Sequence, residues 1–254
     1  MKNLPSVSVH CITFGRPFYL EEAIESFLRQ DYIGPKEMAI FNDLLEQELV
    51  FDHPEIKIIN SNVRCPTLGD ARNELVKNQN GQIILQLDDD DTILPTYIST
   101  CVKLLGNMDW MMPGNAVTLY KYDMKFIENS GSHIVFRKTA WEKVGGYSSM
   151  NTGEDWNFVH KLENAKNNLG INGGFPQSSE IGYVYTWGGD AFHRAILSLN
   201  DISENKKDSN ELVRKLVLKD IEMKRIPSGR IQLIPQWKHD YAGLVNNFLA
   251  SRSK

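Results

Sequence analysis

The amino-acid sequence predicts an α/β protein, a three-layer α/β/α sandwich around a mixed, mainly parallel sheet. Short apolar segments typical of strands alternate with segments in which apolar residues recur every three or four positions. Several strand-like segments end in polar residues, and glycine, proline or asparagine marks the breaks between elements. In sandwiches of this kind the functional groups gather beyond the carboxyl ends of the strands.

The first half of the chain alternates regularly between the two patterns. Residues 7–14 are mostly apolar and run into Gly15-Arg16-Pro17, which indicates a strand that ends in a loop. Residues 19–30 follow with a single apolar stripe at helical spacing, formed by Leu20, Ala23, Ile24, Phe27 and Leu28. Further strands are predicted at 37–41, 55–60 and 82–87, and further helices at 67–77 and from Pro95 onward.

The second half of the chain is less regular. It predicts strands at 132–136 and 181–187, helices at 138–144, 154–165, 191–199 and 210–223, and a loop at 170–176. We expect residues 1–205 to form the α/β domain and residues 206–254 to form a basic, mainly helical C-terminal extension. Residues 206–254 hold 11 Lys or Arg against 5 Asp or Glu, a charge of +6, whereas the other residues hold 17 against 27, a charge of −10.

Composition excludes several classes of protein. With 41% hydrophobic and 24% charged residues among 254, the chain is an ordinary globular protein. It lacks an apolar run of the roughly 18 residues that a membrane span needs, and its start does not resemble a signal peptide, so we expect a cytoplasmic protein. Cys11, Cys65 and Cys101 form no CxxC pair for zinc, and we expect them to be reduced.

Residues 88–91 are four consecutive aspartates that follow the apolar strand predicted at 82–87. Like charges this close raise one another's pKa unless a cation neutralises them. Carboxylate oxygens favour Mg²⁺ or Mn²⁺ over zinc, so the run predicts a divalent metal site. The alternative is an acidic turn that caps the helix beginning near Pro95.

A second acidic pair, Glu154-Asp155, stands between Gly153 and Trp156 at the predicted start of a helix. A carboxylate in this position commonly caps the helix. It also suits a general base that takes the proton of a hydroxyl group during transfer chemistry. The sequence leaves both interpretations open.

Six motifs in this order resemble the family 2 glycosyltransferases over roughly residues 5–190. They are Thr13-Phe14-Gly15-Arg16-Pro17, Phe27-Leu28-Arg29-Gln30, Asn42-Asp43, Ala71-Arg72-Asn73, the aspartate run, and Gly145-Gly146-Tyr147 before Glu154-Asp155-Trp156. The resemblance implies a Rossmann-like GT-A fold and a nucleotide diphosphate sugar donor, most often linked to UDP. It also implies an inverting displacement that depends on Mn²⁺ or Mg²⁺.

The resemblance also implies roles for individual residues. It assigns the donor to Thr13, Phe14, Arg16, Asp43, Arg72, Asp88 and Asp89. It assigns the metal to Asp90 and Asp88, with His193 as a further metal ligand or phosphate contact, and the catalytic base to Asp155. The neighbours of that base, Glu154 and Trp156, are expected to bind the acceptor. The chain departs from the family pattern at Gly15, where Asn is usual, and at Asn42, where the first of two aspartates is usual.

Other functions stay open. The run of aspartates before Thr92 also resembles the motif of haloacid dehalogenase-like phosphatases, in which Asp88 would be the nucleophile. A sugar-nucleotide or glycan binding module without turnover is a third interpretation. For a transferase, the acceptor is a saccharide, a glycoconjugate, or a hydroxymethylated base in viral DNA bound by the basic extension.

Overall fold

The computed structural model describes residues 4–114, 116–120, 123–127, 133–178, 180–186 and 209–252. Its centre is a seven-stranded sheet in the order β11-β7-β10-β5-β1-β2-β4. Its strands are β1 (Val7–Thr13), β2 (Lys36–Asn42), β4 (Ile56–Asn60), β5 (Ile83–Gln86), β7 (Trp110–Met111), β10 (Val135–Arg137) and β11 (Gly173–Gly174). In this sheet β10 runs antiparallel to β5 and β7, whereas the other pairs are parallel, which confirms the mixed, mainly parallel arrangement.

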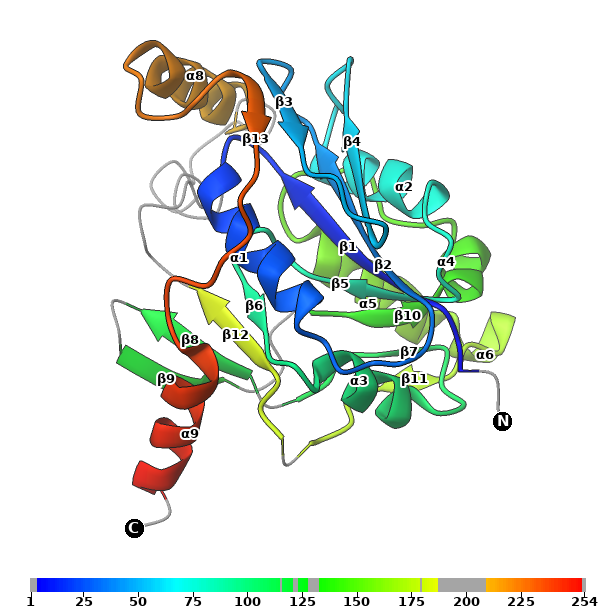
Figure 1. Ribbon diagram of the computed structural model, residues 1–254. Helices are drawn as coiled ribbons and strands as arrows, with labels where there is room; N and C mark the ends of the chain where they lie inside the picture. The colour runs from blue at the N-terminus through cyan, green and yellow to red at the C-terminus, as the bar shows by residue number, and fades with distance from the viewer. Residues whose placement is uncertain are drawn as a thin grey trace.

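Helices cover both faces of the central sheet (Figure 1). The side chains of Val7, Val9 and Cys11 in β1 pack with α1 (Pro17–Leu28) and α3 (Tyr97–Leu105). Ile12 faces the opposite way and packs with α2 (Leu68–Lys77), because successive side chains of a strand point to opposite faces. The same face is also covered by α4 (Lys138–Val144) and α5 (Glu154–Asn164), which the short α6 (Lys166–Leu169) follows.

Two smaller sheets flank the central one. The first has the order β6-β12-β8-β9, with β6 (Thr92–Ile93), β8 (Ala116–Tyr120), β9 (Asp123–Ile127) and β12 (Tyr183–Thr186). The second pairs β3 (Gln47–Val50) in parallel with β13 (Gly229–Gln232).

The C-terminal segment, residues 209–252, packs on the α/β body at three places. Helix α8 (Ser209–Glu222) packs on the loop after β1, β13 pairs with β3, and α9 (Tyr241–Arg252) packs on the flanking sheet. Figure 1 shows α8 and α9 at opposite ends of this segment, with β13 between them. The predicted boundary at 205 and 206, and the helix expected at 191–199, lie outside the described residues.

Most predicted elements match the structure, and the helix predicted at 138–144 is confirmed as Lys138–Val144. The prediction of a loop at 170–176 was wrong in one respect. This segment contains the strand β11, which pairs with Trp110 and Met111. Two glycines form this strand, and because glycine has no side chain, the sequence shows no apolar pattern there. Cys11 and Cys101 are buried, Cys65 is half-buried, and all three are free thiols. No helix in the described ranges is both long and apolar enough to cross a membrane.

The last aspartate of the acidic run joins the central sheet to the flanking sheet. Asp91 is buried, and its Oδ1 accepts a hydrogen bond of 2.8 Å from the Thr186 amide. Its Oδ2 accepts a hydrogen bond from the Tyr183 hydroxyl. Burial, with the charges of neighbouring aspartates, raises the pKa of the Asp91 carboxyl well above its ordinary value. This side chain therefore fixes where β12 lies.

We predict that Asp91→Ala destabilises the protein, because it leaves the Tyr183 hydroxyl and the Thr186 amide without their acceptor. The expected loss is about 1–3 kcal/mol for each buried group left unsatisfied. Urea unfolding measures it. Asp52→Ala, at an exposed aspartate, is the control and should change stability by less than about 0.5 kcal/mol. Equal stability of the two variants would contradict the role given to Asp91.

Candidate functional site

One cleft lies beyond the carboxyl ends of β1 and β5, with a volume of about 190 Å³. Five segments supply its lining: the end of β1 and the loop after it, α2, the acidic run, the first turn of α5 with the loop before it, and α8. They contribute Ile12, Thr13, Phe14, Arg16, Leu68, Arg72, Asp88, Asp90, Asn151, Thr152, Gly153, Glu154 and Asp155, and α8 adds Val213. Figure 1 shows the carboxyl end of β1 on the same side of the molecule as α8. The cleft therefore brings the acidic run and the second acidic pair together.

Arg16 neutralises the middle of the acidic run. It stands at the N-cap position of α1, and its Nε donates to Asp89 Oδ2 at 3.1 Å while its Nη1 donates to Asp90 Oδ2 at 2.7 Å. A further hydrogen bond joins Arg16 Nη2 to Asp89 Oδ1. Burial raises the pKa of Asp89 to about 6, although the Arg16 charge opposes this shift. The guanidinium thus holds two carboxylates that would otherwise repel each other.

Arg72 joins the two acidic motifs. It is buried on α2, where its Nη2 donates to Asp88 Oδ1 and its Nε donates to Glu154 Oε1, both at 3.1 Å. Burial lowers the pKa of Arg72, but the charges of Asp88 and Glu154 outweigh it and raise that pKa above its ordinary value. The arginine therefore stays charged and fixes the start of α5 against the end of β5.

Asp155 occupies the first turn of α5, and its side chain borders the cleft. Its Oδ1 accepts a hydrogen bond of 2.7 Å from the Trp156 amide. Burial, followed by the charge of Glu154, raises the pKa of Asp155 to about 6 against the opposing charge of Arg72. A carboxylate with this pKa is ionised near neutral pH and still basic enough to accept a proton.

The remaining predicted residues lie at or around the cleft. Thr13 and Phe14 line it, and Arg64 stacks over the Phe14 ring at 4.5 Å. Asp43, Asp89 and Trp156 lie outside its lining within the described residues. Asp43 is buried, and its Oδ1 accepts from the Cys65 amide at 2.9 Å. Trp156 is 39% exposed on α5.

Sequence reasoning did not find every lining residue. Asn151 and Thr152 stand just before Gly153 and the second acidic pair, so the predicted start of the helix at 154 could have pointed to them. Val213 comes from the C-terminal segment and packs with Phe14 in the loop after β1. In the sequence it is one apolar residue of a helical stripe, and this pattern does not indicate which part of the fold it contacts.

The donor set of the cleft fits a magnesium or manganese ion that also binds a diphosphate. Within the described ranges, no group of three or more His, Cys, Asp or Glu side chains is arranged to hold a metal on its own. Asp88 and Asp90 nevertheless both border the cleft. Mg²⁺ usually takes one or two carboxylates and completes its shell with water and substrate phosphates. His193 lies outside the described residues.

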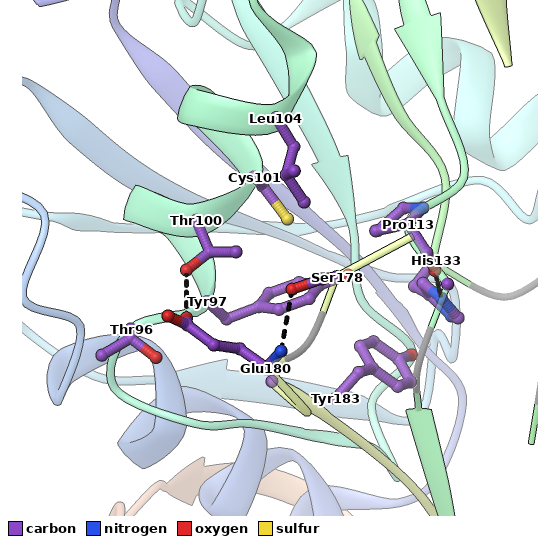
Figure 2. Close-up of a pocket in the computed structure, with 12 residues that line it drawn as sticks. Thr96, Tyr97, Thr100, Cys101, Leu104, Pro113, His133, Ser178, Glu180 and Tyr183 are labelled. Carbon is purple, nitrogen blue, oxygen red and sulfur yellow. Dashed lines mark hydrogen bonds between the residues drawn. The ribbon is translucent and has the colours of Figure 1, made fainter. Parts of the chain in front are cut away.

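A second cavity, shown in Figure 2, has a different character. It lies between α3 and the segment that leads into β12, and its volume of about 10 Å³ is room for about one water molecule. Glu180 closes it by accepting from Thr100 Oγ1 at 2.8 Å and by donating its amide to Ser178 Oγ at 3.0 Å (Figure 2). On the other wall, His133 Nε2 donates to the Pro113 carbonyl. This cavity is too small for a nucleotide.

Comparisons with known proteins identify the family of the chain. The model of Glycosyl transferase family 2 matches residues 8–141, which include the loop after β1 and the whole acidic run. WcaA of Escherichia coli (strain K12), named for glycosyl transfer in colanic acid biosynthesis, is 31% identical over 106 residues. That match covers 39% of this chain and 37% of WcaA, so the chain spans well under half of this relative's length.

Solved structures of TarS from S. aureus share the fold. TarS 1-349 in complex with UDP-GlcNAc has a TM-score of 0.55 at 14% identity, covering 85% of this chain and 73% of that one. TarS 1-349 in complex with UDP has a TM-score of 0.54 at 15% identity, covering 87% and 73%. This likeness shows the GT-A fold that the sequence predicted. Because the family model matches more than half of the residues of this chain, the chain belongs to glycosyl transferase family 2.

Proposed function

We propose that this glycosyltransferase inverts the anomeric carbon as it moves a sugar from a nucleoside diphosphate, UDP in the first instance, to an acceptor hydroxyl. The observation that carries the proposal is that Asp88, Asp90 and Asp155 border one cleft. The complexes of TarS with UDP and UDP-GlcNAc support the donor class. As a member of a glycosyltransferase family, the chain gives no support to the phosphatase interpretation of Asp88.

Asp155 suits the role of general base in a single displacement. The acceptor oxygen forms a bond to the anomeric carbon, and the bond from that carbon to the diphosphate oxygen breaks. The proton of the acceptor hydroxyl passes to the Asp155 carboxylate, and the bonding electron pair leaves with the nucleoside diphosphate. Attack from the face opposite the leaving group inverts the configuration at the anomeric carbon.

The charge of the cleft explains why a divalent cation belongs to this proposal. Among the described lining residues, four carboxylates stand against two guanidiniums, an excess of two negative charges when all are ionised. Both guanidiniums already bind carboxylates of the protein. A bound Mn²⁺ or Mg²⁺ would supply the positive charge that stabilises the nucleoside diphosphate as it leaves. Asp88 and Asp90 are the residues proposed to hold it, and Arg16 and Arg72 keep those carboxylates in position.

We propose a saccharide or glycoconjugate acceptor in preference to DNA. Four of the eight described basic residues of the C-terminal segment pair with carboxylates: Arg225 with Asp220, Arg230 with Glu48, Lys238 with Glu22, and Arg214 with Glu46 and Glu211. Its aromatic residues are engaged as well, because Arg29 lies over Trp237 at 4.3 Å and the Tyr241 hydroxyl donates to Glu22 at 2.7 Å. These contacts engage half of the described basic residues of the segment and two of its aromatic rings, which weakens the case for a surface that binds DNA phosphates and bases.

The donor is the first thing to test. We expect UDP-sugars with Mn²⁺ to raise the melting temperature, because a ligand at 100 times its Kd stabilises by about 2.7 kcal/mol. Asp88→Asn should lose the Mn²⁺-dependent part of this rise and keep its own fold, since an amide oxygen still accepts from Arg72. Asp52→Asn is the matched control. If no nucleoside diphosphate stabilises the parent protein, the proposed function is wrong.

The base is tested separately by Asp155→Asn. We expect kcat to fall by about 10²–10⁴-fold, because the amide cannot accept the acceptor proton, while donor binding stays within about twofold. Steady-state kinetics and donor titration measure the two effects. Glu163→Gln, at an acidic residue farther along α5, should keep the parent kcat. A variant that transfers as fast as the parent would remove Asp155 from the mechanism, and a parent that binds donor without turnover would favour the binding module.

The pKa of Asp155, raised to about 6, predicts the pH dependence. The base works only when ionised, so kcat/KM should rise about tenfold per pH unit below pH 6 and level off above it. Glu154→Gln removes a negative charge that raises this pKa, so the rise should move to lower pH. A profile that is flat between pH 5 and 7 would contradict the assignment.

A further inference from the structure

The cleft has two chemically different ends. Arg72, Asp88, Asp90, Glu154 and Asp155 give one end its charge. The other end is apolar where Phe14 and Val213, which pack in one cluster, line the cleft. If the charged end takes the diphosphate and the sugar, the flat nucleobase is left with the apolar end, where side chains can stack against it.

One wall of the apolar end comes from the C-terminal segment. Val213 on α8 is 3% exposed and forms one cluster with Phe14, Leu44, Val217 and Ile226. The same valine borders the cleft. A residue about 200 positions after β1 therefore packs against the loop that follows β1.

The loop after β1 is shaped to receive α8. Gly15 has a φ of +76°, and a Cβ built on it would lie 3.0 Å from Val217 Cγ1 and 3.4 Å from Leu44 Cδ2. A side chain here would be strained by the backbone and would press on α8. The close packing accounts for a glycine at a position where the family usually has asparagine.

The helix is also held from its far end. The Gln47 side-chain amide donates to the Pro227 carbonyl at 2.6 Å, and β13 continues the contact by pairing with β3. Arg225 donates to Asp220 at 3.1 Å, which closes the turn after α8. Because α8 packs on Phe14 and the segment after it is fixed to β3, Val213 has little freedom to move away from the cleft.

We propose that α8 completes the nucleobase end of the donor site, and that Val213 selects the base by its size. This inference rests on the proposed function. Val213 borders the cleft from α8 and packs with Phe14 of the loop after β1, so its methyl groups limit the room left for a base. A purine needs more of that room than a pyrimidine and would press on the valine. Contacts of one or two methyl groups in an apolar pocket are worth about 10–200-fold in discrimination.

The test compares UDP with ADP by calorimetric titration in the presence of Mn²⁺. We expect Val213→Ala to reduce the preference for UDP over ADP by about tenfold, because the smaller side chain admits the larger base. Val213→Ile should increase that preference, and its retained bulk guards against a variant that fails to fold. Val245→Ala is the matched control, since Val245 is 2% exposed on α9, in a different cluster.

The outcomes separate this inference from the proposed function. If the parent binds neither nucleotide, the proposed function fails and the inference falls with it. If the parent binds UDP and both Val213 variants keep the parent ratio of UDP to ADP affinity, only the inference is overturned. The same holds if Val245→Ala changes the ratio as much as Val213→Ala does.

Discussion

Mutual repulsion among four adjacent aspartates is the constraint on which the rest of this site depends. The structure resolves it by giving the carboxylates different partners. Asp89 and Asp90 bind Arg16, Asp88 binds Arg72, and Asp91 turns away to β12. Each partner comes from another part of the fold, so the acidic run ties together α1, α2 and the flanking sheet. Only Asp88 and Asp90 keep a surface on the cleft.

Arg72 extends this network to the second acidic motif. Through Glu154 it fixes the first turn of α5, which carries Asp155. Glu154 was expected from the sequence to bind the acceptor, and in the structure its carboxylate is 4% exposed and paired with Arg72. Its charge also raises the pKa of Asp155, after the larger effect of burial. A contact of Glu154 with the acceptor stays a prediction, whereas its influence on the neighbouring carboxyl follows from the geometry.

The long elements were predictable because their side chains repeat with a clear period, as in Val7, Val9 and Cys11 of β1 or Leu20, Ile24 and Phe27 of α1. The two-residue strands were not, since Gly173 and Gly174 have no side chains to show a period.

The usual family aspartate at position 42 is replaced for a reason that only the structure gives. Asn42 Nδ2 donates to the Gln47 carbonyl at 2.9 Å, and an aspartate cannot donate that bond. The roles of the individual site residues stay predictions. The position of Val213 in the wall of the cleft could be recognised only from the three-dimensional packing of α8.

The parallel pairing of β13 with β3 joins segments about 180 residues apart. A contact between segments so far apart in the sequence forms late, because the entropy cost of closing a long loop comes before the pairing can stabilise the fold. During synthesis from the N-terminus, β1, β2 and β5 leave the ribosome well before β13 does. Until α8 has been synthesised, Phe14 therefore lacks its cluster partners Val213, Val217 and Ile226, although the acidic run and both arginines are already present.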